Sequence, residues 1–94
     1  RIIHTVDRAK LMQFEAKIEV SPRDGIANPE GSTIERSLPA LGFEMTRNVR
    51  VGKLIRFEVE AESADAARSL VEDMCNRFLT NPVIEDAAVE VLET

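Results

Sequence analysis

The stretch "SADAARSLVEDMCNRFLTNP", residues Ser63 to Pro82, carries the strongest helical pattern in this 94-residue chain. Its apolar side chains recur every three or four residues, which is the spacing of an amphipathic helix with one buried face. They are Ala67, Leu70, Val71, Met74, Cys75, Phe78 and Leu79. Ser63 can cap the first turn, and Asn81 with Pro82 ends the helix. A helix with this apolar face must pack it against another element, so the fold depends on the segments before and after the helix.

Segments of alternating polarity lie on both sides of this helix. Before it, the apolar residues at odd positions are Val49, Val51, Ile55, Phe57 and Val59. Gly52 leaves two interpretations open: a hairpin with an odd-length or bulged turn, or one long strand bent at the glycine. After the helix, a last strand is predicted by Val83, Ala87, Val89 and Val91, although Glu85 interrupts this apolar row.

The N-terminal half begins with another alternating segment. A half-buried strand is predicted by Phe14, Ala16, Ile18 and Val20. The prolines and glycines of residues 21–31 favour turns. Ser32 and Glu35 have the spacing of a capping box, which predicts a helix beginning at Thr33 and leaves few free donors there for an anion.

This first helix has a narrow apolar stripe made of Ile34, Leu38 and Leu41. Pro39 removes one helical hydrogen bond, so we expect the helix to be short or kinked and to close at Gly42. The order of elements predicts an α+β fold: a two-layer sandwich of an antiparallel sheet with two helices on one face, in a βαββαβ-like arrangement.

The first residues do not join the pattern. Met12 directly precedes the first strand, so we expect residues 1–11 to be an N-terminal extension or an artificial addition, and residues 12–94 to form one domain. His4, the single histidine, lies in the first segment and is interpreted as solvated.

The amino-acid composition excludes several classes of partner. The net charge is −5, with no dense Lys/Arg cluster, which argues against nucleic acid and membrane surfaces as partners. One cysteine cannot form an internal disulfide, and no apolar run approaches the length of a membrane span. The cytoplasm is the simplest compartment.

No constellation of residues predicts catalysis, a bound cofactor or a metal site. Cys75 lies on the apolar stripe late in its helix, which favours core packing over nucleophilic chemistry. Glu58, Glu60 and Glu62 could together hold a hard cation, but their regular spacing is more typical of a solvated strand face. The chain lacks metal-binding, phosphate-binding and dinucleotide-binding motifs.

Three stretches, "NPEGSTIERSLPALGF", "VRVGKLIRFEVE" and "MCNRFLTNPVIEDAAVEV", together resemble the PurS family, the small subunit of phosphoribosylformylglycinamidine synthase. The resemblance runs from about Gln13 to Glu93. It implies a subunit of a purine-biosynthesis ligase without catalytic residues of its own. In such a complex the glutaminase subunit PurQ releases ammonia, the synthetase subunit PurL uses ATP and Mg²⁺, and the small subunit bridges them as a homodimer or homotetramer.

The resemblance also marks recurrent positions, which we expect to form subunit contacts or turns. They are Asn28, Pro29, Gly31, Arg50, Gly52, Lys53, Asn81, Pro82 and Glu85. Asn28 stands where family members often carry Asp. Arg50 and Lys53 are the predicted partner contacts, because charges beside a glycine bend are exposed. The alternative from a different class is a small-molecule sensor module, since dimeric α+β domains often bind ligands at their interfaces.

Overall fold

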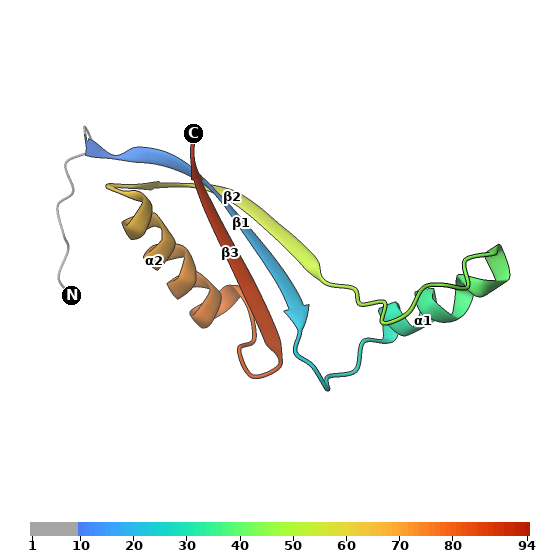
Figure 1. The fold of residues 1–94 in the computed structure, drawn as a ribbon. Helices are drawn as coiled ribbons and strands as arrows, with labels where there is room; N and C mark the ends of the chain where they lie inside the picture. The colour runs from blue at the N-terminus through green and yellow to red at the C-terminus, as the bar shows by residue number, and fades with distance from the viewer. Residues whose placement is uncertain (1–9) are drawn as a thin grey trace.

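The computed structural model describes residues 10–94 and contains a three-stranded sheet with two helices (Figure 1). The elements follow one another as β1 (Met12–Pro22), α1 (Pro29–Ser37), the 3₁₀ turn η2 (Pro39–Leu41), β2 (Lys53–Ala61), α2 (Ala64–Met74), the π-helical turn η3 (Cys75–Leu79) and β3 (Glu85–Glu93). The expected segment 1–11, with His4, falls almost entirely outside the described residues.

The sheet is antiparallel, with β1 between β2 and β3. Ala16 of β1 lies opposite Phe57 of β2 and Val91 of β3, so apolar side chains from all three strands share one face. The predicted α+β class with an antiparallel sheet is therefore confirmed.

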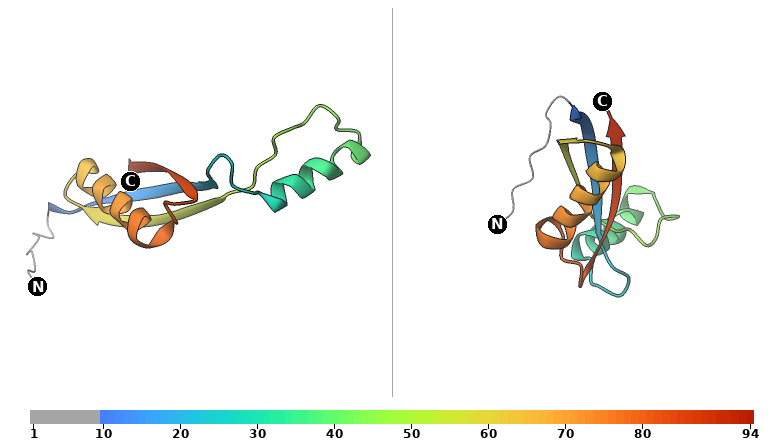
Figure 2. Two further views of the ribbon diagram at one scale, coloured as in Figure 1. Left: turned by 90° about the horizontal axis from the view of Figure 1, so that it is seen from below. Right: turned by 90° about the vertical axis from the view of Figure 1, so that its left-hand side faces the viewer.

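The core lies between this face and α2, which covers one side of the sheet (Figure 2). The predicted alternation is confirmed, because Phe14, Ala16, Ile18 and Val20 are all buried. They pack with Ala67, Val71 and Cys75 from the helical segment. Burying a side chain the size of Phe14 or Ile18 contributes roughly 1.5–3 kcal/mol.

The opposite face of the sheet is charged and open. Lys17 pairs with Glu90 at 3.9 Å, and Arg56 pairs with Glu15 at 3.2 Å. Glu58 also lies on this face, where it is exposed. Among residues 10–94 no cluster of carboxylate, histidine or cysteine side chains could hold a metal ion.

The placement of α1 differs from the expected sandwich. Instead of lying beside α2, it extends past the end of the sheet, as Figure 1 and the first view of Figure 2 show. The molecule measures 58 × 28 × 14 Å, and its radius of gyration is 18.2 Å. A compact chain of this length would have a radius of gyration of about 12 Å. We call residues 29–48 the arm.

The start of α1 was also predicted wrongly. The helix begins at Pro29 and is capped by Asn28, because an Asn–Pro pair supplies a capping side chain followed by a residue suited to the first helical position. The Ser32 amide instead donates to the Asn28 carbonyl within the helix, so there is no capping box. Pro39 does shorten the helix as expected, and Gly42 closes η2 with a φ of 98°.

Two strand boundaries differ from the sequence pattern. Residues 49–52 belong to no strand, and a single strand β2 begins at Lys53, so there is no hairpin at Gly52. Val83 precedes β3 and is 79% exposed, because the turn before the strand takes it out of the apolar row. The Ser63 cap is confirmed: its hydroxyl accepts from the Ala66 amide at 3.0 Å.

Candidate functional site at the neck

The chain leaves the sheet through residues 23–28 and returns through residues 49–52. Together with residues 29–35 of α1 and Lys53 of β2, we call these two crossing segments the neck. Asn28 joins them. Its Oδ1 accepts from the amides of Gly31 at 3.0 Å and Val51 at 3.2 Å, and its Nδ2 donates to the Val51 carbonyl at 3.1 Å. One side chain thus caps α1 and pairs with the returning segment.

Two glycines let the neck close tightly. A Cβ atom on Gly31 would lie 2.2 Å from the Val49 carbonyl oxygen, and one on Gly52 would lie 2.4 Å from the Val20 carbonyl oxygen. Both distances are shorter than real Cβ contacts. Glu35 adds a further clamp, since its Oε1 accepts from the Val49 amide at 2.9 Å. These contacts hold the base of the arm against the end of the sheet.

Arg50 ties the neck to the end of β1. Its guanidinium donates to the carbonyls of Pro22 and Arg23 and lies 3.7 Å from a carboxylate oxygen of Asp24. Arg23 in turn connects to β3 and the turn before it: its amide donates to the Ile84 carbonyl at 2.8 Å, and its Nε lies 3.4 Å from an Asp86 carboxylate oxygen. Arg50 therefore has a structural task, which its prediction as an exposed contact did not include.

The segment "NPVIE", residues 81–85, forms a closed turn before β3 at the same end of the sheet. Asn81 Oδ1 accepts from the Val83 amide at 3.1 Å, and Glu85 Oε1 accepts from the Asn81 amide at 2.8 Å. Pro82 lies within this turn. The conformation of Asn81, Pro82 and Glu85 is thus explained by turn chemistry.

Lys53 differs from its neighbours in the neck, because it is exposed and no ion pair engages it among residues 10–94. It borders an open hollow of about 220 Å³. Glu30 from α1 and Glu85 from β3 border the same hollow. The predicted positions Asn28, Pro29, Gly31, Arg50, Gly52, Lys53 and Glu85 therefore gather at one end of the sheet, which the sequence alone could not establish.

Sequence reasoning missed Glu35 and Arg23 as members of the neck. Glu35 was assigned to a capping box, and Arg23 had no pattern to single it out. The Asn–Pro pair at residues 28–29 was the available signal, because placing the cap at Asn28 frees Glu35 for a distant partner.

Cys75, the one cysteine of the chain, is unsuited to nucleophilic chemistry. Burial first, and the Glu72 carboxylate second, raise the pKa of the Cys75 thiol. Cys75 lies in the core and is only 3% exposed, as the sequence predicted. Raising its pKa reduces the thiolate form that a nucleophile requires. The neck, with an exposed lysine that forms no ion pair among residues 10–94, is suited to contacting another macromolecule.

These features define a small α+β interaction module built on an antiparallel sheet. Residues 15–93 match the profile of the PurS family, described as phosphoribosylformylglycinamidine (FGAM) synthase. The chain belongs to the PurS family.

Relatives of known function and known structure agree with this assignment. The chain is 39% identical over 82 residues to the PurS subunit of phosphoribosylformylglycinamidine synthase from Methanothermobacter thermautotrophicus, covering 87% of this chain and 96% of that one. The crystal structure of the Thermotoga maritima PurS subunit is 38% identical, with a TM-score of 0.80 over 87% of this chain and 94% of that one. The structure of PurLQS from Thermotoga maritima includes a chain that is 38% identical, with a TM-score of 0.78 over 85% of this chain and 98% of that one.

Proposed function

We propose that this chain is the small, non-catalytic subunit of a phosphoribosylformylglycinamidine synthase in purine biosynthesis. The observation that carries the proposal is its similarity to the PurS family over residues 15–93, including the chain of the PurLQS assembly. The neck supports this role, because hydrogen bonds and close backbone contacts hold it together at an exposed end of the sheet. The sensor alternative gains no support from the relatives.

The proposed partners are the synthetase subunit PurL and the glutaminase subunit PurQ. In this scheme glutamine, ATP and Mg²⁺ are used by those subunits, and this chain binds none of them itself. Its task is to hold the two larger subunits together so that ammonia passes between them. We place the complex in the cytoplasm. Among the described residues, none of the helices combines the length and apolar character required to span a bilayer.

Assembly of the purified subunits tests this function. PurL and PurQ from the same organism are mixed with glutamine and ADP, with and without this chain, and the masses are measured by size-exclusion chromatography with light scattering. We expect a ternary complex only when this chain is present. A stable PurL–PurQ complex that forms equally without it, or a failure of this chain to join either subunit, would contradict the bridging role.

A further inference from the structure

Two pairs of like charges face each other on the side of the sheet opposite α2, which we call the open face (Figure 2). The register places Glu15 of β1 directly opposite Glu58 of β2, and Lys17 directly opposite Arg56. Like charges in such positions destabilise a sheet. Arg56 relieves part of the repulsion by contacting Glu15 at 3.2 Å, but Glu58 forms no ion pair among residues 10–94. Folding alone therefore does not explain a carboxylate at position 58.

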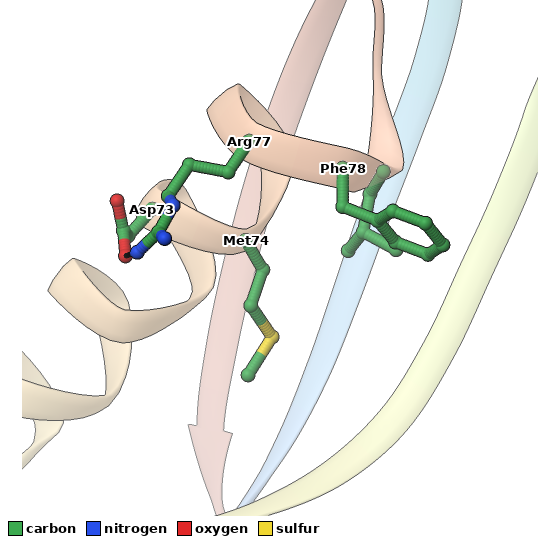
Figure 3. A pocket seen from close by; sticks show the side chains of 5 residues that line it. Asp73, Met74, Arg77 and Phe78 are labelled. Carbon is green, nitrogen blue, oxygen red and sulfur yellow. Dashed lines mark hydrogen bonds and ion pairs between the residues drawn. The ribbon is translucent and has the colours of Figure 1, made fainter.

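The open face carries most of the net charge of the chain. It has six acidic and two basic side chains, so it holds four of the five net negative charges. Glu19 and Glu60, like Glu58, form no ion pair with any described residue. The helical side differs, because its charges are paired along the helix, as Figure 3 shows for Asp73 and Arg77 at 3.3 Å. The excess negative charge of the open face is thus not neutralised within the part of the chain that the structure describes.

The open face also offers apolar side chains and joins the neck. Leu54 and Leu92 lie on its two outer strands and are 54% and 53% exposed. Leu54 and Glu19 border an open hollow of about 350 Å³, and Gly52 and Lys53 of the neck border the same hollow. A partner that covers the open face can therefore contact the neck as well.

The size of the open face fits one part of a protein–protein interface. Three strands about 4.8 Å apart, each at least nine residues long, form a face of about 30 Å by 15 Å. This is about half of the roughly 800 Å² that each partner buries in a standard interface. The neck supplies further area through the hollow that it shares with the face.

The charge of the open face determines which kind of partner fits. A second copy of the chain would oppose four net negative charges with the same number, and nucleic acids and anionic lipids are repelled in the same way. Within residues 10–94 no group of carboxylate, histidine or cysteine side chains is arranged to hold a metal ion. Lysine and arginine side chains on a different protein complement this face.

We propose that the open face docks on a basic surface of one of the two larger subunits of the complex. Lysine or arginine side chains of that subunit pair with Glu19, Glu58 and Glu60, and apolar atoms beside them cover Leu54 and Leu92. The proposal rests on the proposed function, which supplies the partner. The like charges then have a reason, because a register that costs stability in the free chain is neutralised in the complex.

Titration calorimetry of Glu58→Lys with purified PurL and with purified PurQ tests the docking. The substitution removes the repulsion with Glu15, so the urea midpoint should equal or exceed that of the wild type. We expect the Kd for one of the two subunits to rise at least about tenfold at about 0.05 M NaCl. The ratio of variant to wild-type Kd should fall toward one at about 1 M NaCl, because salt screens exposed charges. Glu58→Gln replaces this variant if it fails to fold.

A matched control changes the same charge elsewhere. Glu93→Lys alters an exposed glutamate that the register places on the helix-bearing side of β3, and it should leave both Kd values unchanged. An unchanged Kd of Glu58→Lys for both subunits, or an equal loss with Glu93→Lys, would overturn the docking and leave the proposed function intact. A wild-type chain that binds neither subunit would overturn both.

Discussion

Asn28 and Val51 exchange two hydrogen bonds across the neck: the Val51 amide donates to Asn28 Oδ1 at 3.2 Å, and Asn28 Nδ2 donates to the Val51 carbonyl at 3.1 Å. The same Oδ1 also caps α1 through the Gly31 amide. One amide side chain therefore helps to hold the arm in its orientation relative to the sheet, together with the Glu35 clamp and the close contacts of Gly31 and Gly52. An amide supplies both the acceptor and the donor that this geometry uses.

Two substitutions of Asn28 should lower the stability of the fold by different amounts. Asn28→Ala removes the cap and both bonds to Val51, and should lower the free energy of unfolding by about 2–3 kcal/mol. Asn28→Asp keeps the acceptor and loses only the donor, so a loss of about 1 kcal/mol is expected. Urea unfolding at one fixed protein concentration measures both. Asn76→Ala on the exposed side of the helical segment is the control, and an equal effect there would contradict the role of Asn28.

The two serines that the sequence predicted as helix caps should behave differently. Ser63 accepts from the Ala66 amide and Ser32 caps nothing, because α1 begins before it. Ser63→Ala should cost about 1 kcal/mol of unfolding free energy, whereas Ser32→Ala should be neutral or slightly stabilising. Thermal unfolding of both variants provides the comparison. Similar losses of unfolding free energy at both positions would contradict this assignment and indicate a capping box at Ser32.

The buried thiol makes stability depend on pH at the alkaline end. The pKa of Cys75 is raised in the folded chain, so the unfolded chain loses this proton first as pH rises. Its contribution to stability is therefore complete below the unfolded pKa of about 8.5 and is lost as pH rises through the higher folded pKa. Urea midpoints of the wild type should fall more steeply than those of Cys75→Val above that pH. Parallel slopes would contradict the assignment.

Lys53 is the neck residue that we expect to act on a partner without supporting the fold. Lys53→Ala should leave the unfolding free energy within about 0.5 kcal/mol of the wild type, since the side chain is exposed. It should weaken assembly with PurL and PurQ, measured by titration calorimetry. Lys10→Ala, another exposed lysine, is the charge-matched control. Arg50→Ala should instead destabilise the chain, because Arg50 bonds the end of β1.

Periodicity predicted which side chains of β1 are buried, but not the direction of α1. The alternation from Phe14 to Val20 correctly predicted a strand with one buried face, but not its central place in the sheet. The stripe of Ile34, Leu38 and Leu41 correctly identified a helix, yet its predicted place on the chain's own sheet was wrong. The direction of α1 depends on the backbone contacts of Gly31 and Gly52 with distant residues, which no local pattern records.

The candidate site, like the fold, could be predicted from the sequence only in part. Local turn chemistry accounts for Asn81 and Glu85, so their positions could be inferred from sequence. Glu30, Lys53 and Glu85 lie around one hollow. Predicting this would require knowledge of the strand order, because β3 pairs with β1 and not with β2, the strand that precedes it in the sequence. Pattern and spacing could not supply that order.

The central claim is that this chain connects ammonia production to its use without taking part in either reaction. The most direct measurement is the rate of amidine formation by purified PurL and PurQ, with and without this chain, using either glutamine or ammonium chloride as the nitrogen source. We predict that glutamine-dependent turnover requires this chain, while ammonia-dependent turnover by PurL hardly changes. Equal glutamine-dependent rates in its absence would contradict the account.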